Sequence, residues 1–336
     1  MSSLNMNGVG AAEYCLPKID YSRHPAYCDQ RHSNEDRVSI LEEFRPIVAN
    51  KRKIIQSCAE IYSRRVVSHS DTKVDRLARD GAVALTIEKS HISAIRDAAK
   101  AAEASLRTQI FGKRRLRLKF RETQYLVHSD TEPCSGFETL EAVVRRVILS
   151  SGALDIASAY FGGQPARIGR VMFRINVPQQ PFCTRMFSDP AIPHPKTTGM
   201  HIDCNGRPML NGNIYLSEVG LENGPTGNVK GSNHWQFDIE DRAIRKSFDD
   251  RMVRESTERK LMALPEELRR RANFGHEIED GTVLSDLLLS AERRYTSEDG
   301  NLVLFDADAV HRGGDVLSGE RVAVLFCIRM GNEAHS

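Results

Sequence analysis

Residues 301–329 read NLVLFDADAVHRGGDVLSGERVAVLFCIR and contain the pattern that decides the fold. Two apolar runs, 301–305 and 321–329, are separated by a polar segment that contains several glycines and aspartates. Short apolar runs bounded by such turn residues are typical of β-strands. His311 lies in the turn between the two runs, and Arg321 begins the second run. The stretch therefore predicts two strands joined by a polar turn.

The same alternation of short strands and turns continues toward the amino terminus. In residues 170–177 apolar and polar side chains alternate, which predicts a strand with one apolar face and one polar face. Further predicted strands cover residues 82–87, 113–121, 212–219 and 226–229. This succession predicts an α+β protein with a mainly β core, built as a double-stranded β-helix, the cupin-like jelly roll.

Helices are predicted to flank the strands. Apolar residues recur at helical spacing in residues 37–68, where Pro46 predicts a break, in residues 90–106 and in residues 137–160. Each segment has an apolar side that can pack on a sheet or on another helix.

These segments predict three parts of the chain. Residues 1–36 show little apolar periodicity and predict an irregular N-terminal arm, and residues 37–74 form a helical annex. Residues 75–330 form the jelly-roll domain. Within it, the charged and helix-prone residues at about 238–272 predict a helical insertion over one end of the barrel.

Composition limits the partners and the compartment. The 47 Lys and Arg residues nearly balance the 45 Asp and Glu residues, so no overall positive field favours nucleic acid. The seven cysteines are scattered singly without a CxxC pair, which fits a reducing cytoplasm and no disulfide framework. No run approaches the ~20 apolar residues of a membrane span, so we expect no membrane partner.

The triplet His201-Ile202-Asp203 is the strongest chemical signal. On a strand, alternate residues share a face, so His201 and Asp203 would point the same way, roughly 6.5 to 7 Å apart. With His311 they supply two imidazoles and one carboxylate, which can hold one face of an iron(II) ion and leave the other face open. A chain with 11 histidines produces such a triplet by chance fairly often, so ordinary core or turn roles stay open for each residue.

Arg321 adds a second signal, ten residues after His311. Its planar guanidinium suits the carboxylate of an organic acid bound to the same metal. A purely structural metal site has no use for such a group.

Several motifs in this order resemble the phytanoyl-CoA dioxygenase (PhyH)-like family of Fe(II)/2-oxoglutarate-dependent oxygenases. The resemblance covers roughly residues 75 to 330. The motifs are Asp80-Gly81-Ala82-Val83 before the helix at Ser90, Met200-His201-Ile202-Asp203, the segment ENGPTGNVKGSNH at 222–234, and Val310-His311-Arg312-Gly313-Gly314 followed by Arg321. One residue more than usual precedes His234, which is more consistent with a turn or core histidine than with a ligand.

The resemblance implies a site and its cofactors. His201, Asp203 and His311 would bind Fe(II), and Arg321 would pair with the distal carboxylate of 2-oxoglutarate, with O2 as the oxidant. Further contacts to 2-oxoglutarate would come from Thr198, Asn213 and Thr226. Thr226 could equally serve the turn after Pro225.

The resemblance also implies a reaction. The expected activity is dioxygenase oxidation of a C–H bond, most simply by a hydroxylase reaction, with release of succinate and CO2. Desaturation, epoxidation and ring rearrangement stay open, because the position of the substrate decides between them. Halogenases of this superfamily lack the carboxylate ligand, so Asp203 disfavours halogenation. The basic residues of 113–121 together with Arg170 and Arg174 suit a small polar or anionic substrate, and the motifs suggest natural product biosynthesis.

Two other functions fit the same residues. The chain could be a non-catalytic jelly-roll protein that binds a metal or a small molecule. It could also be a cupin-type oxygenase that does not use 2-oxoglutarate. A homodimer is expected only because dimers are the commonest assemblies.

Overall fold

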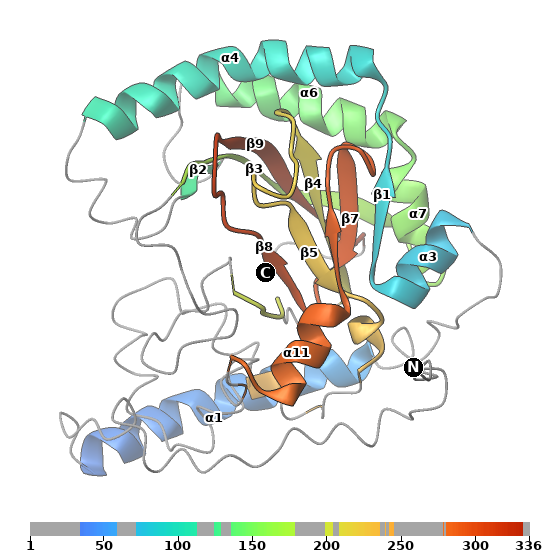
Figure 1. The fold of residues 1–336 in the computed structure, drawn as a ribbon. Coiled ribbons are helices and arrows are strands. Elements are labelled where there is room, and N and C mark those ends of the chain that lie inside the picture. The colour runs from blue at the N-terminus through green and yellow to red at the C-terminus, as the bar shows by residue number, and fades with distance from the viewer. Residues whose placement is uncertain are drawn as a thin grey trace.

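A computed structural model describes residues 34–58, 72–112, 124–128, 136–178, 199–203, 208–235, 239, 242–244, 278 and 280–331. These residues form two antiparallel sheets with helices packed on the larger one (Figure 1). Among the helices described, none is long and apolar enough to cross a membrane.

The larger sheet has six strands in the order β1-β7-β4-β9-β3-β2. The long neighbours β3 and β9 pair along most of their length, with a register shift between Ile168 and Val171. The strands are β1 (Ala82–Leu85), β2 (Gln124–His128), β3 (Ala166–Asn176), β4 (Met209–Tyr215), β7 (Leu302–Asp306) and β9 (Arg321–Met330).

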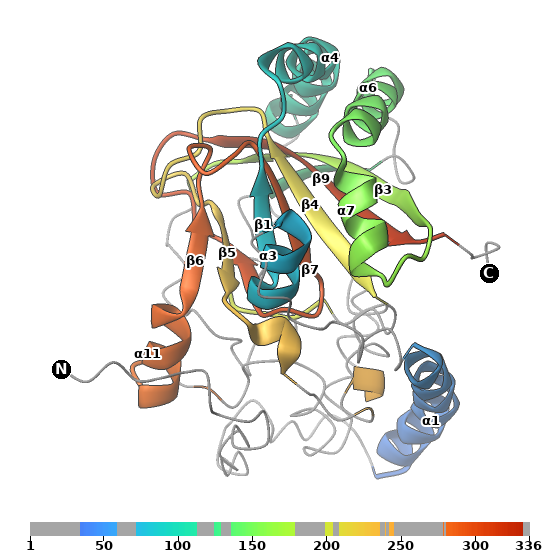
Figure 2. The ribbon, with the colours of Figure 1, turned by 90° about the vertical axis from the view of Figure 1, so that its right-hand side faces the viewer.

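Helices cover one face of this sheet. Figure 2 shows α4 (Lys89–Gly112), α6 (Phe137–Ser150) and α7 (Ala153–Tyr160) on the side of the large sheet away from the small sheet. Alternate residues of the strands, such as Phe173, Val324 and Leu304, form one buried apolar cluster with residues of these helices. Burial of this apolar surface is the main stabilising contribution to the fold.

The opposite face of the large sheet carries a different set of side chains. Tyr215, Phe305 and Ala323 form a smaller buried cluster there with Tyr295 of the small sheet. Polar residues share this face at the alternate positions of β3, β4 and β9: Arg174, Asn176, Asn211, Asn213 and Arg321. The polar side chains of the large sheet therefore lie on the face that is turned toward the small sheet.

The small sheet has the order β6-β5-β8, from β6 (Glu292–Tyr295), β5 (Thr226–Val229) and β8 (His311–Gly313). The loop that leads into β5 and the loop that follows β8 lie against each other. A Cβ on Gly224, whose φ is +67°, would lie 2.1 Å from the carbonyl oxygen of Gly314. The two glycine-containing motifs at 222–227 and 311–314 are thus in backbone contact, which only glycine permits.

A buried ion pair ties the small sheet together. Arg312 Nε and Nη2 donate to the two carboxylate oxygens of Glu292, each at 2.7 Å, and both side chains are at most 4% exposed. The Glu292 side chain crosses over Gly227, where a Cβ would lie 1.9 Å from Oε1. This glycine therefore makes room for the ion pair.

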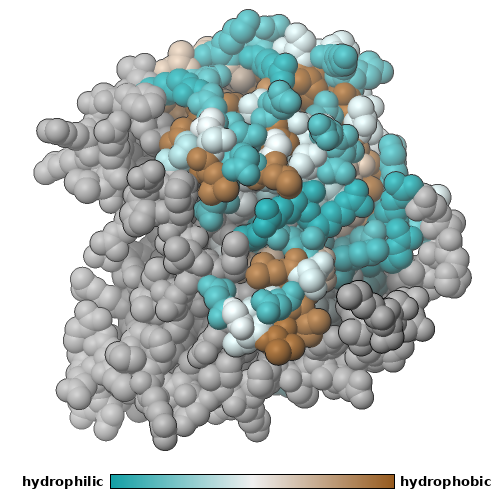
Figure 3. All heavy atoms as spheres, in the orientation of Figure 1, coloured by the Kyte–Doolittle hydropathy of each residue, from teal (hydrophilic) through white to brown (hydrophobic). Residues whose placement is uncertain are grey.

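Shorter helices complete the fold. The helix α3 (Lys73–Asp80) begins with a capping box between Thr72 and Asp75 and ends at Gly81, whose φ of +79° suits a C-terminal cap. The remaining elements are α1 (Asn34–Ser57), α11 (Val283–Ser290) and the 3-10 turn Ser232–His234. Figure 3 shows the described side chains of one face as mainly hydrophilic, with apolar ones in small groups, as expected of a surface in water.

Three predictions about secondary structure were wrong. The helix α1 continues through Pro46, which removes one backbone hydrogen bond without ending the helix. The single helix predicted at 137–160 is two helices, because Gly152 adopts a φ of +75° between them. His311 lies in a strand, β8, and not in a turn, because its backbone pairs with β5 and with His201.

Most strand predictions were confirmed within a few residues, including 226–229 for β5 and 321–329 for β9. The strand predicted at 113–121 lies outside the described residues, and so do nearly all of the N-terminal arm at 1–36 and most of the insertion at 238–272. The division into arm, annex and jelly-roll domain stays a prediction.

We predict that Glu292→Gln lowers the free energy of unfolding by about 3 kcal/mol, because it leaves the buried Arg312 guanidinium without its counter-charge. Asp97→Asn is the matched control, since Asp97 pairs with Lys100 on the surface, where both side chains are more than 60% exposed. That change should cost less than about 1 kcal/mol. Urea unfolding of both variants measures the difference, and equal costs would contradict the role given to the buried pair.

Candidate metal and organic-acid site

Backbone pairing brings the three predicted metal ligands together. His201 and His311 form an antiparallel bridge in which each N–H donates to the other's carbonyl, both at 2.9 Å. The Asp203 N–H donates to the Ala307 carbonyl at 2.9 Å. The segment at 201–203 thus lies beside β8, although it forms an isolated bridge and not the regular strand that the triplet predicted.

The ligand atoms of His201, Asp203 and His311 all lie within 4.8 Å of one another. Nε2 of His201 is 3.6 Å from Asp203 Oδ1, and Nε2 of His311 is 3.4 Å from Asp203 Oδ2. Both rings are buried, whereas the Asp203 side chain is 42% exposed. An ion or small ligand can therefore approach from the Asp203 side.

Hydrogen bonds select the histidine nitrogen that faces the centre. Nδ1 of His201 lies 2.8 Å from the Gly199 carbonyl, and Nδ1 of His311 lies 2.8 Å from the Ala309 carbonyl. A carbonyl only accepts, so each Nδ1 carries the proton and each Nε2 presents a lone pair. This arrangement is characteristic of metal-ligating histidines.

Asn211 orients the carboxylate, with Nδ2 donating to Asp203 Oδ2 at 2.7 Å. Sequence reasoning missed Asn211 because the predicted strand began one residue later, at Gly212. The signal was present, since Asn211, Asn213 and Tyr215 alternate on β4 and share a face.

The charges of the three ligands are strongly coupled. Burial lowers the pKa of His201 to about 4, helped by repulsion from His311. Burial raises the pKa of the Asp203 carboxyl, but the His311 and His201 rings and the Asn211 amide lower it by more, so it lies below its ordinary value. Burial lowers the pKa of His311, yet attraction to Asp203 outweighs this and raises it. Without a metal, the raised pKa favours a second proton on the His311 ring at mildly acidic pH, and this proton must leave before Nε2 can bind a metal.

Arg321 is a buried cation on the same side of the large sheet. Its side chain makes one hydrogen bond in the described structure, from Nε to Asn176 Oδ1 at 3.4 Å, and no ion pair. Burial lowers the pKa of its guanidinium, and attraction to Tyr215 and Asp315 offsets only part of this effect. Arg312, by contrast, is fully paired with Glu292.

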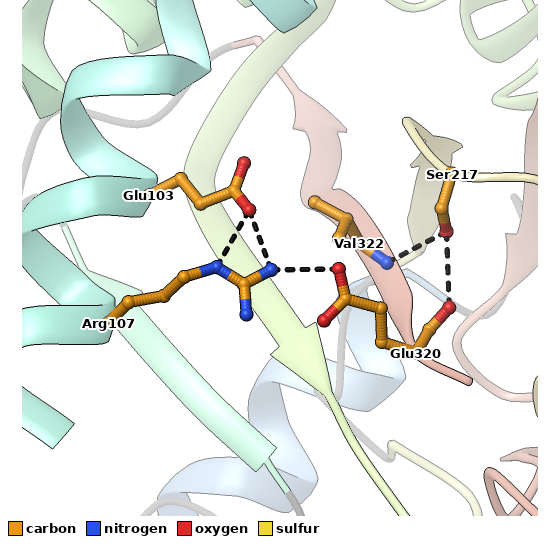
Figure 4. Close-up of polar contacts among 5 residues, drawn as sticks. All are labelled: Glu103, Arg107, Ser217, Glu320 and Val322. Atoms are coloured by element: carbon orange, nitrogen blue, oxygen red, sulfur yellow. Dashed lines mark hydrogen bonds and ion pairs between the residues drawn. The ribbon is translucent and has the colours of Figure 1, made fainter. Parts of the chain in front are cut away.

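The backbone on both sides of Arg321 is held firmly. Figure 4 shows Arg107 of α4 between Glu103 and Glu320, with hydrogen bonds of 2.6 and 2.8 Å from Nη2. On the other side, the Val322 N–H donates to Ser217 Oγ at 3.0 Å. These contacts fix the beginning of β9, so the Arg321 side chain leaves the sheet from a defined position.

Asn213 and Thr226 meet between the two sheets. Asn213 Nδ2 donates to Thr226 Oγ1 at 2.6 Å, and Tyr215 Oη lies 3.1 Å from the same oxygen. The Tyr215 hydroxyl also donates to the Tyr295 carbonyl at 2.9 Å. Asn213 Oδ1 is buried without a partner. The second Nδ2 proton of Asn213 and the Thr226 hydroxyl proton are then available to donate to a bound ligand.

Arg174 also lies on this face, opposite Ala323, and it is buried, whereas Arg170 is exposed. It is close enough to His201 to lower the pKa of that ring. The predicted basic face of β3 is therefore partly internal. His234 lies in the turn after β5 and outside the ligand cluster, as expected, whereas Thr198 lies outside the described residues.

Comparisons with known proteins give a distant similarity of fold. No protein-family model and no curated protein matches the chain. AviO1 from Streptomyces viridochromogenes Tue57 is 14% identical over 81% of this chain and 99% of its own, with a TM-score of 0.45. The non-heme alpha ketoglutarate dependent carbocyclase SnoK from nogalamycin biosynthesis is 18% identical over 78% and 84%, with a TM-score of 0.44. EctD from S. alaskensis with bound Fe is 14% identical over 78% and 76%, with a TM-score of 0.44. Similarities at this level establish no family and no function.

We predict that Co(II) binding at pH 6 releases about one proton, because a metal ligand must be deprotonated. The raised pKa of His311 keeps a proton on the cluster at this pH, whereas His201, with a pKa of about 4, is already neutral. Affinity should therefore fall as the pH falls through the pKa of His311. Calorimetry in buffers of different ionisation enthalpy counts the protons, and release of two would contradict this assignment.

Proposed function

We propose that the chain is an Fe(II)/2-oxoglutarate-dependent dioxygenase that hydroxylates a C–H bond of a small polar metabolite and releases succinate and CO2. The observation that carries the proposal is Arg321, a buried guanidinium without an ion pair in the described structure, on the same sheet face that supports a His-Asp-His cluster. A buried cation left without an anion is costly. A carboxylate of 2-oxoglutarate would supply that anion.

The proposal includes the finer fold. We propose that the large and small antiparallel sheets are the two halves of a double-stranded β-helix whose interior contains the site. Contacts between the sheets support this, since Tyr215 of β4 donates to the Tyr295 carbonyl of β6, and Asn213 donates to Thr226 of β5.

The ligand set fits iron(II). Two neutral imidazoles and one carboxylate occupy one face of such an ion and leave positions for an organic acid and O2. With O2 as the oxidant, the metal and 2-oxoglutarate would supply chemistry able to oxidise an unactivated C–H bond, with one oxygen atom ending in succinate and the other in the product. Asp203 fills the position that halogenases leave for halide, so we propose hydroxylation and not halogen transfer.

Each remaining residue then has a role in binding. Arg321 would hold the distal carboxylate of 2-oxoglutarate through its planar fork. Asn213 and Thr226 would donate hydrogen bonds to the same molecule, and Thr198 stays a candidate for a further contact. Tyr215 keeps Thr226 in place, since it contacts both the Oγ1 and the backbone N–H of that residue.

The substrate class is proposed from the sign of the charge beside the ligand cluster. Arg174 is a second buried cation near His201, which favours a substrate with a carboxylate or other anionic group. A small polar compound of natural product biosynthesis fits this better than a fatty acyl chain. A homodimer stays a prediction.

An anaerobic titration tests the class of protein. Fe(II) and 2-oxoglutarate together should give a visible metal-to-ligand charge-transfer band, and His201→Ala should abolish it. A non-catalytic binding protein, or an oxygenase that does not use 2-oxoglutarate, would give no band that depends on the organic acid. A screen of polar metabolites for stimulated succinate release would then identify the substrate.

We predict that Arg321→Gln weakens 2-oxoglutarate binding about 10- to 100-fold, as expected for loss of about 1.5 to 3 kcal/mol from a charged hydrogen-bonding group. Co(II) affinity should not change, because Arg321 is not a ligand. Arg170→Gln is the matched control on the exposed part of β3 and should leave both affinities as they are. Equal 2-oxoglutarate affinities for the wild type and Arg321→Gln would exclude this role.

A further inference from the structure

A buried carboxylate outside the ligand cluster supports the turn between β7 and β8. Asp306, the last residue of β7, is fully buried, and it pairs with Leu210 on the helix-covered side of the sheet. Its Oδ2 accepts a hydrogen bond from the Tyr160 hydroxyl at the end of α7. Its Oδ1 accepts from the Asp308 N–H at 3.0 Å. The carboxylate thus joins a covering helix to the turn at 307–310.

The same turn holds two of the proposed metal ligands. The Ala307 carbonyl accepts from the Asp203 N–H at 2.9 Å. The Ala309 carbonyl lies 2.8 Å from His311 Nδ1 and fixes the ring so that Nε2 faces the centre. The Ala309 N–H in turn donates to the Asp306 carbonyl at 3.0 Å. A shift of this turn would therefore move both ligands.

The environment of Asp306 explains why a carboxylate and not an apolar residue suits this position. Its backbone N–H donates to the Gly81 carbonyl at 2.8 Å, at the end of α3. Asn233 joins the same group, since Nδ2 donates to the Ala78 carbonyl at 2.8 Å and contacts Tyr160 Oη at 3.5 Å. A buried carboxyl group needs hydrogen-bond donors, and α7 and the turn each supply one.

We propose that Asp306 and Tyr160 are positioning residues for the metal centre, which hold the 307–310 turn and thereby the Asp203 backbone and the His311 ring. The inference rests on the proposed metal site. The described hydrogen bonds of the two side chains reach the ligands through the turn carbonyls, and the charge of Asp306 also attracts the His311 ring. Such outer contacts typically contribute 10- to 100-fold to metal affinity.

Two substitutions test the proposal, with Co(II) alone as the probe. Tyr160→Phe removes one hydroxyl and leaves the ring in the core, and Asp306→Asn removes the charge with little change of shape. We expect both variants to bind Co(II) at least about tenfold more weakly and to show an altered visible absorption spectrum of the bound ion. Asp306→Glu, which restores the charge, should recover part of the affinity.

The control is Asn301→Ala, at the opposite end of β7. Asn301 Oδ1 accepts from the Ile87 N–H at 2.7 Å, so this change should lower the melting temperature without changing Co(II) affinity or spectrum. If Tyr160→Phe and Asp306→Asn lose stability yet keep the wild-type Co(II) affinity and spectrum, the pair is only structural and the proposal fails. Should Asp306→Asn not fold, Tyr160→Phe alone decides.

Failure of the metal site itself would look different. His311→Ala should abolish the Co(II) spectrum. If the wild type and His311→Ala bind Co(II) equally, the proposed function fails, and the positioning role of Asp306 and Tyr160 fails with it. If only His311→Ala is impaired, the metal site stands and the positioning role alone is overturned.

Discussion

The two backbone hydrogen bonds between His201 and His311 are the constraint on which the site depends. They join residues 110 positions apart in the chain and place both imidazoles on one edge of the small sheet. The rings come to lie 4.4 Å apart between centroids, with Asp203 in reach of both. Together with the hydrogen bond from the Asp203 N–H to the Ala307 carbonyl, this bridge connects the two segments that carry the three ligands. The geometry of the His-Asp-His cluster is therefore a property of strand pairing more than of the triplet itself.

The two faces of the large sheet divide stability from chemistry. One face packs on α4, α6 and α7 with apolar residues at every second position. This face can therefore be closely packed and rigid without burying polar groups that need partners. The other face can then carry asparagines and arginines, because the strands are already held from behind. Contacts such as those of Arg107 with Glu320 show how the helix layer also fixes the ends of strands that carry polar residues. Rigid elements of this kind hold a binding site more accurately than loops do.

Much of this arrangement could be predicted from the sequence, and the failures have physical causes. Alternation in 170–177 and the apolar run at 321–329 predicted strands, because a strand with two different faces imposes a period of two and a strand buried on both faces is apolar throughout. Alternation does not reveal which strands pair, so the bridge from His201 to His311 and the contact of Asn211 with Asp203 were not foreseen. Gly152 ended a helix that apolar spacing alone extended to 160. Asp306 could not be distinguished from the other aspartates in the sequence, because only its burial in the fold gives it a specific role.

The buried charges distinguish structural from functional residues in a way that sequence motifs cannot. Arg312 lies next to His311 in the sequence, yet its guanidinium is satisfied by Glu292 and has a structural explanation. Arg321 begins an apolar strand ten residues after His311, and its side chain makes one long hydrogen bond in the described structure. A folded chain retains such a cation at a cost in stability. An anionic ligand would offset this loss of stability when it binds. The incomplete pairing of Arg321 is therefore better evidence for an organic-acid site than the presence of an arginine after a histidine motif.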